Sequence, residues 1–209
     1  MNPPFLPGGT SLAKSCCAVI ELPVAQQAVA EAAARPANQL NIESMNKTRN
    51  TLDPALRRKS IAALNLIVAD LFDLFARIKQ AHWNVRGTAF IGLHKLLDEF
   101  AATTLAHIDD AAERATALGG VVEGTLRDSA KNSPLKKKEE PASRSGMSDW
   151  IHELADVHAA SGRIVSKAVL DLSEAHDFGT ADLLTGILRD LDKQLWLLEA
   201  HINQQQPSK

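Results

Sequence analysis

Residues 90–120 read FIGLHKLLDEFAATTLAHIDDAAERATALGG, and this stretch decides how the chain folds. It predicts one long helix from about Phe90 to Leu118. The Gly119-Gly120 pair that follows is a typical stop at the C-terminal end of a helix. The rest of the chain has a similar bias, because Ala and Leu are plentiful and aromatic residues make up only 4%. That composition favours helices over sheets.

The segment before this helix predicts another long helix, from Asp53-Pro54 to near Gly87. Asp53 is a good N-cap, and Pro54 fits the first helical position. Behind them, apolar residues recur mostly at the spacing of an amphipathic helix: Leu56, Ile61, Leu64, Val68, Leu71, Phe72, Phe75 and Ile78. The sequence thus places two long helices in succession.

Residues 120–147 form a connection that is long for a compact domain. It contains prolines and a KKKEE run at residues 136–140, and we expect it to cross the bundle and to contain at most a short helix. A third helix is predicted at about residues 148–175 and a fourth at about residues 180–203. Four long helices with one long crossover between the second and the third predict an all-α bundle of the ferritin-like arrangement.

The two ends of the chain differ from the helical part, which we assign to residues 51–203. Residues 1–50 hold five of the nine prolines, both cysteines and an Ala-rich stretch. We expect a poorly ordered extension there, with at most a short helix at residues 24–34. Met45 is an alternative start, and residues 204–209 are expected to be a flexible tail.

Composition also restricts the class of protein. The two cysteines, Cys16 and Cys17, are adjacent and cannot form a good disulfide, which suits a reducing cytoplasm. No apolar run approaches the ~20 residues of a membrane span. Glu21 and Pro23 interrupt the one stretch that resembles a signal peptide. A net charge of −2 excludes a polycation, so any nucleic-acid binding requires local basic patches.

The helix at residues 90–118 carries two pairs of metal-ligand side chains, His94 with Asp98 and Asp109 with Glu113. Each pair is spaced by four residues and lies on one face of a helix. Asp98 and Asp109 are eleven residues apart, close to three whole turns, so both pairs share that face. From Asp98 to Glu113 the helix rises about 22 Å at ~1.5 Å per residue, so one metal ion cannot contact both pairs of the same helix.

Two antiparallel copies of this helix remove that difficulty. The two pairs have the same midpoint in the sequence, so a two-fold axis there sets His94 opposite Glu113 of the second copy and Asp98 opposite Asp109. Ala101, Ala102 and Ala106 lie on or beside this face and allow close approach. The spacing therefore predicts a dimer interface with two equivalent metal sites.

His82, near the end of the first helix and beside Trp83, is expected to approach His94 if the two helices pack antiparallel. Two imidazoles and up to three carboxylates suit iron and are poor ligands for thiolate-seeking metals. The alternative for each residue alone is a solvated acid or a structural histidine. Zinc hydrolysis has no H-E-x-x-H motif to support it, and we read His152 and His158 as surface positions.

At these residues the chain strongly resembles the Dps family, the ferritin-like mini-cages also called DNA-binding proteins from starved cells. The resemblance covers about residues 47–203. It rests on KQAHWNVRG at residues 79–87, on Phe90, Leu93-His94, Asp98 and Asp109 through Ala112-Glu113-Arg114, and on Thr180-Ala181-Asp182 and Asp190-Leu191-Asp192-Lys193 through Trp196. None of the five ligand positions is substituted.

The resemblance implies a hollow homododecamer with ferroxidase sites at two-fold interfaces. His82, His94 and Asp98 would come from one subunit, and Asp109 and Glu113 from its neighbour. The family typically oxidises Fe(II) with hydrogen peroxide and stores ferric mineral, which removes both reagents of hydroxyl-radical formation and protects DNA. The expected bound metal is therefore iron, Fe(II) or Fe(III).

Two further expectations rest on the resemblance. Asp182, and after it Asp177, are candidates for a pore through which iron enters at a three-fold axis, although charge at a helix N-terminus is an adequate alternative. Trp83 is a candidate radical quencher or an interface packing residue.

DNA binding is the alternative function, as a nucleoid-associated architectural protein whose metal site is secondary. The segment before Lys47 lacks the Lys-rich arm that neutralises phosphates in many relatives. The remaining basic candidates are Lys47, Arg49, Arg57-Arg58-Lys59 and residues 136–138. A catalytically silent shell with zinc in the site is a third possibility.

Overall fold

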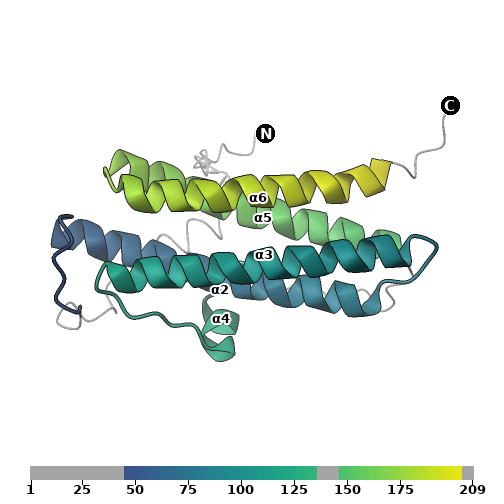
Figure 1. Ribbon diagram of the computed structural model, residues 1–209, viewed down its shortest axis with the longest axis horizontal. Coiled ribbons are helices and arrows are strands. Elements are labelled where there is room, and N and C mark those ends of the chain that lie inside the picture. The colour runs from purple at the N-terminus through teal and green to yellow at the C-terminus, as the bar shows by residue number, and fades with distance from the viewer. Residues whose placement is uncertain (1–44, 136–145, 204–209) are drawn as a thin grey trace, which may run out of the picture. The chain divides into compact units, whose positions relative to one another are not determined.

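The computed structural model describes residues 45–135 and 146–203, all within one unit, Arg35–Lys209. In these two ranges the chain forms four long helices, one short helix and no strand (Figure 1). The helices are α2 (Pro54–Asn84), α3 (Phe90–Ala117), α4 (Leu126–Asn132), α5 (Met147–Glu174) and α6 (Phe178–Asn203). The predicted four-helix bundle is thereby confirmed, including the long crossover between the second and third long helices.

Local signals set the start of α2 and the corner that follows it. The Asp53 carboxylate accepts a 2.7 Å hydrogen bond from the Ala55 N–H, and Pro54 occupies the first turn. After α2 ends at Asn84, Gly87 adopts a φ of 133°, a conformation that residues with a Cβ rarely adopt. This glycine lets the chain reverse into α3.

The end of α3 is fixed by a second glycine and by the segment that precedes α2. Gly119 has a φ of 89°, and its carbonyl accepts a 2.8 Å hydrogen bond from the Asn46 N–H. A Cβ on Gly119 would lie 2.6 Å from the Asn46 carbonyl oxygen, so only glycine allows this approach. Met45 and Asn46, which the sequence suggested were part of the extension, therefore contact the helical part: Met45 packs against the core and Asn46 bonds to Gly119. The rest of the extension, with its expected helix at 24–34, and the tail lie outside the described residues, so the domain boundaries stay predictions.

The crossover contains the short helix α4. Thr125 and Asp128 form a capping box, in which each side chain accepts a hydrogen bond from the other residue's backbone N–H. A Ser133 to Asp73 hydrogen bond of 2.9 Å then ties the end of α4 to α2. The charge run at 136–140 lies outside the described residues.

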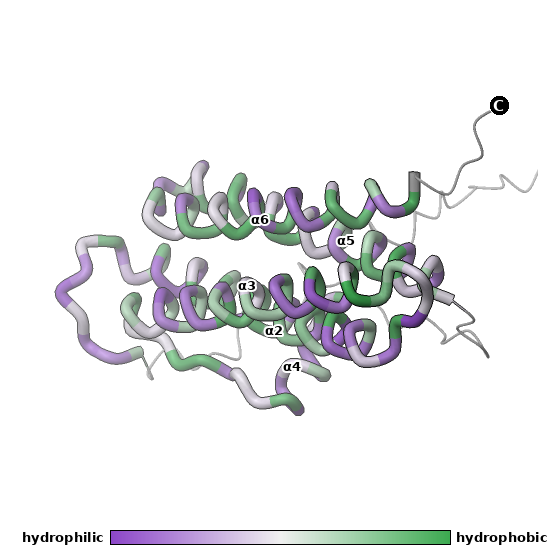
Figure 2. The backbone as a smooth tube through the Cα atoms, turned by 45° about the vertical axis from the view of Figure 1, so that its right-hand side comes forward, coloured by the Kyte–Doolittle hydropathy of each residue, from purple (hydrophilic) through white to green (hydrophobic). Residues whose placement is uncertain are grey.

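The long helices pack in two pairs, α2 with α3 and α5 with α6, and α2 also packs on α5 (Figure 1). Hydrophobic and hydrophilic residues alternate along each long helix (Figure 2). The apolar faces meet in one core, whose fully buried members include Leu64, Ile67, Leu71, Leu74, Ile78, Leu93, Leu97, Ile151, Leu172 and Leu184. No helix in the described ranges is long and apolar enough to span a membrane.

Candidate metal centre

His82 and His94 lie side by side across the corner that joins α2 to α3. His82 is in the last turn of α2, and His94 is in the second turn of α3. Their ring centroids are 3.8 Å apart and their planes differ by 19°, so the two rings are stacked. Phe90, one turn before His94, packs with its ring centroid 5.0 Å from that of His94. The predicted approach of the two histidines is thus found within a single chain.

Each histidine ring is held by the backbone of the other histidine. His82 Nδ1 lies 2.9 Å from the His94 carbonyl oxygen, and His94 Nδ1 lies 3.0 Å from the His82 carbonyl oxygen. A carbonyl oxygen can only accept, so both Nδ1 atoms carry the proton and donate it. In a neutral ring this leaves the Nε2 lone pair of each histidine free. Such backbone contacts are the usual means of orienting metal-ligating histidines.

Asp98 adds a carboxylate to this pair. It lies one turn after His94 on α3, and its Oδ1 is 3.9 Å from His82 Nε2. Lys79 Nζ donates a 2.8 Å hydrogen bond to the same oxygen. This hydrogen bond, together with the positive charge of Lys79, lowers the pKa of Asp98. The carboxylate is therefore ionised and, with 62% of its side chain exposed, faces solvent.

Asp109 and Glu113 lie on the same exposed side of α3, nearer its C-terminal end. The described part of the chain offers neither carboxylate a hydrogen bond or an ion pair. Asp98 and Glu113 are separated by about 22 Å of helix at ~1.5 Å per residue. Among the described residues of one chain, no group of three or more His, Cys, Asp and Glu side chains is arranged to hold a metal ion, and this includes His82, His94 and Asp98. One chain carries two separate halves of the predicted ligand set.

Between the two halves, α3 exposes three apolar side chains, two of them small. Ala102, Leu105 and Ala106 are exposed there, with Leu105 49% exposed. Ala101, which the sequence placed with them, is only 3% exposed and faces the core of its own chain. The exposed strip therefore lies slightly to one side of the predicted alanine face.

Lys79 and Phe90 also lie at this centre, and the contacts they make there were not predicted from the sequence. Lys79 binds Asp98, and its Nζ lies 5.8 Å from the ring centroid of Trp83. Phe90 covers His94. The only signal for Lys79 was its position one turn before Trp83 on the same helix, which says nothing about contact with α3. Trp83 itself is 70% exposed and stays a candidate for interface packing.

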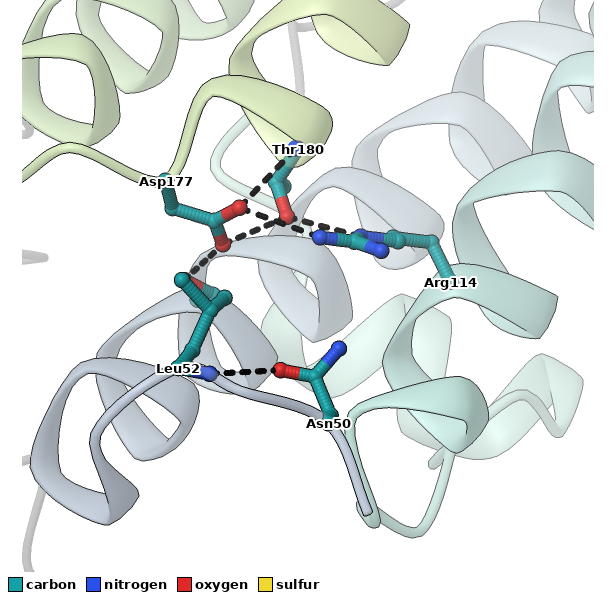
Figure 3. A network of polar contacts seen from close by, with 6 residues as sticks. Asn50, Leu52, Arg114, Asp177 and Thr180 are labelled. Carbon is teal, nitrogen blue, oxygen red and sulfur yellow. Dashed lines mark hydrogen bonds and ion pairs between the residues drawn. The ribbon is translucent and has the colours of Figure 1, made fainter. Parts of the chain in front are cut away.

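Asp177, the second pore candidate, points into the chain. It precedes α6 and caps it, accepting 3.1 Å and 2.6 Å hydrogen bonds from the Thr180 N–H and hydroxyl (Figure 3). Ser60 donates to it at 2.6 Å, and Arg114 at 3.0 Å. Because Asp177 is only 1% exposed and fully bonded, the structure argues against a pore-lining role. Asp182, which is exposed on α6, stays the candidate.

The cap at Asp177 also explains why α6 begins at Phe178, two residues before the predicted start near Thr180. Burial alone would raise the pKa of Asp177. The hydrogen bonds from Ser60 and Thr180 and the charge of Arg114 outweigh that effect, and the pKa is lowered. This network joins α2, α3 and α6.

The prediction that His158 is a surface residue is wrong. It is 1% exposed, and its Nδ1 donates a 2.7 Å hydrogen bond to the Leu154 carbonyl. Its Nε2 lies 3.0 Å from the side-chain amide of Gln194 on α6. The amide atom nearest to Nε2 is Gln194 Oε1, and burial lowers the pKa of His158. His152 is exposed, as predicted.

Comparisons with known proteins find several similar chains. Residues 61–206 match the model of the ferritin-like domain family. The chain is 39% identical over 159 residues to the DNA protection during starvation protein of Agrobacterium fabrum, covering 76% of this chain and 97% of that protein. It is 31% identical over 152 residues to DNA protection during starvation protein 2 of Bacillus anthracis, covering 71% and 100%.

Solved structures of Dps proteins are also similar to this chain. DpsC from Streptomyces coelicolor superposes with a TM-score of 0.71 at 31% identity, covering 76% of this chain and 92% of that one. The Dps from Microbacterium arborescens in its high iron form superposes with a TM-score of 0.66 at 31% identity, covering 73% and 98%. With the stacked histidine pair, the ionised Asp98 and the four-helix fold, these matches show that the chain belongs to the ferritin-like family and, within it, to the Dps proteins.

Proposed function

We propose that this protein is a ferroxidase that oxidises Fe(II), with hydrogen peroxide as the oxidant, at sites shared between two copies of the chain. It stores the ferric product as mineral inside a hollow dodecameric cage and so protects DNA in the cytoplasm. The observation that carries this proposal is the pair of stacked imidazoles with free Nε2 atoms beside the ionised, exposed Asp98.

The residues present fit iron as the substrate. Two imidazole nitrogens and one carboxylate on one copy form half of a mixed nitrogen and oxygen site. Asp109 and Glu113 of a second copy would complete it, because a two-fold axis midway along α3 sets them opposite Asp98 and His94. The exposed Ala102 and Ala106 leave room for a second α3 to approach there.

The reaction balances without a further reagent. Two Fe(II) ions each lose one electron, and these two electrons with two protons cleave the O–O bond of hydrogen peroxide into two waters. Carboxylate ligands favour the product, because a hard anion stabilises Fe(III) more than Fe(II). Paired oxidation also avoids the single-electron cleavage of peroxide that releases a hydroxyl radical. The removal of both Fe(II) and peroxide is how the protein would protect DNA.

The first experiment loads the assembled protein with Fe(II) without oxygen, adds hydrogen peroxide and follows ferric absorbance. We expect fast oxidation in the wild type and a loss of about 100-fold in a His94→Ala, Asp98→Ala double variant that still assembles. A Glu99→Ala, Asp110→Ala double variant is the matched control, since both acids are exposed on α3 beside the predicted ligands. Equal rates in the wild type and in the His94, Asp98 variant would refute the shared site.

Direct DNA binding is the second candidate, since the similar proteins of Agrobacterium fabrum and Bacillus anthracis are named for DNA protection. Among the described basic residues, the Arg57 guanidinium donates to the Leu118 carbonyl and Lys59 Nζ to the Asp171 carbonyl. Lys47 and Arg49 are exposed. A gel shift over a range of salt concentrations tests this function, and no shift even at low salt would leave iron oxidation as the function.

A further inference from the structure

Asp70 is a buried acid that the proposed function does not use. It lies in the middle of α2, is 0% exposed, and neither of its carboxyl oxygens has a hydrogen-bond partner. Ile67, Leu71 and Leu74, all on the same helix, are also fully buried. His82 is twelve residues further along α2, about 18 Å at ~1.5 Å per residue, so Asp70 does not belong to the metal centre.

Asp70 faces α5, which runs antiparallel to α2. At one end of this contact Lys59 Nζ donates to the Asp171 carbonyl at 3.0 Å. At the other end Arg77 Nη1 lies 3.9 Å from Glu153 Oε1. Between these two charged contacts, one buried polar side chain on each helix lacks a hydrogen-bond partner.

These two side chains are Asp70 and Ser161. Ser161 is 0% exposed, and its hydroxyl has no hydrogen-bond partner of ordinary geometry. It nevertheless lies close enough to act on Asp70, because it lowers the pKa of that carboxyl. A buried polar group without a hydrogen-bond partner is costly. Asp70 and Ser161 both lack such a partner and lie together, which implies that a proton lies between them.

The charges around Asp70 do not supply a partner. On its own helix, Asp73 and Arg77 act on it in opposite directions, and these two residues pair with each other at 2.9 Å. On α5, His158 is neutral and already bonded to Leu154 and Gln194. From the end of α4, Ser133 donates to Asp73 and carries no charge.

We propose that Asp70 and Ser161 form an internal proton-binding site that joins α2 to α5. In weakly acidic solution Asp70 of the folded chain carries a proton, and the Ser161 hydroxyl is its polar neighbour on α5. In alkaline solution Asp70 loses this proton, and the resulting buried, unpaired carboxylate weakens the contact between the two helices. The site makes the stability of the bundle sensitive to pH.

The direction of the pH effect follows from linkage. Burial, the largest influence, raises the pKa of Asp70 to about 7 in the folded chain. In the unfolded chain an aspartate titrates near 4, so between about pH 4 and pH 7 the folded chain binds more protons than the unfolded chain. The stability that the proton contributes is therefore lost as the pH rises through this window.

The test compares the full-length wild type, free of iron, with Asp70→Asn, whose amide is a neutral substitute for the protonated acid. Thermal unfolding between about pH 5 and pH 9 should show that the wild type loses several degrees of Tm relative to Asp70→Asn as the pH rises. Glu174→Gln, which changes an exposed acid at the end of α5, is the matched control and should keep the pH slope of the wild type. Parallel profiles for the wild type and Asp70→Asn would overturn the proposal.

Two further measurements do not depend on Asp70→Asn folding well. Ser161→Ala removes a group that lowers the pKa of Asp70, so the decline in Tm should move to higher pH. Difference infrared spectroscopy of the wild type across the same pH range should show the carbonyl stretch of a carboxylic acid disappearing near neutral pH. If no such band is found and Ser161→Ala keeps the wild-type profile, the internal proton site does not exist.

Discussion

Lys79 binds Asp98, the carboxylate that the proposed site offers to a metal ion. Its ammonium donates a 2.8 Å hydrogen bond to Asp98 Oδ1, the oxygen that faces His82 Nε2 at 3.9 Å. A metal ion that binds Asp98 must therefore compete with this contact. Because an ammonium and a metal ion are both cations, the competition opposes binding.

We predict that Lys79→Gln binds Zn(II), used as a redox-silent probe, several-fold more tightly than the wild type, because Asp98 becomes free. Isothermal titration calorimetry of the assembled protein measures this. Lys95→Gln is the control, since Lys95 is an exposed lysine beside His94 on α3. Weaker binding by Lys79→Gln would mean that Lys79 holds Asp98 in place for the metal instead.

At the scale of the helices, the Asp177 network fastens the start of α6 to α2 and α3. Arg114, directly after the predicted ligand Glu113, donates to the Thr180 hydroxyl at 2.9 Å and to Asp177 at 3.0 Å (Figure 3). Asp177 is 1% exposed, so the loss of one bonding group leaves a buried carboxylate with too few donors.

Arg114→Met should therefore destabilise the protein by about 3 kcal/mol. The lowered pKa of Asp177 means that its stabilising effect is present above the unfolded value near 4 and is lost as the pH falls through the folded value. Without Arg114 the folded pKa rises, so the variant should begin to unfold at a higher pH on acidification than the wild type. Urea unfolding at several pH values measures both effects, with the exposed Arg163→Met as control. Equal acid sensitivity of Arg114→Met and the wild type would contradict this account.

At the scale of the whole molecule, the proposed site requires two chains. A variant with His94→Ala and Asp98→Ala keeps Asp109 and Glu113, whereas a variant with Asp109→Ala and Glu113→Ala keeps the other half. In a mixed pair related by a two-fold axis, one site regains all its ligands and the other loses both halves.

We predict that each double variant alone is inactive and that the two, unfolded and reassembled together in equal amounts, recover about one quarter of the wild-type rate of peroxide-dependent iron oxidation. Ferric absorbance after co-assembly measures this, and mixing without unfolding is the control. No recovery in correctly assembled mixtures would show that the two halves do not act together.

The sequence predicted features that depend on neighbours along the chain. Asp53-Pro54 marks the start of α2 and Gly119-Gly120 the end of α3, because caps and glycine stops act within one turn. Residues spaced by about one turn share a face, so the common side of α3 that carries Asp98 and Asp109 followed from counting. The approach of His82 to His94 also followed, since only the short corner around Gly87 separates their helices.

Only the tertiary structure decided which side chains meet between helices distant in sequence. Periodicity says that a residue faces a neighbour but not which neighbour or at which height, so the burial of His158 and Asp70 and the bonding of Asp177 were not predictable. The same holds for the bond from Lys79 to Asp98 and for the backbone carbonyls that fix the protons of both imidazoles. Register between packed helices depends on the fit of whole apolar faces, and this fit determines where buried polar groups find, or lack, a partner.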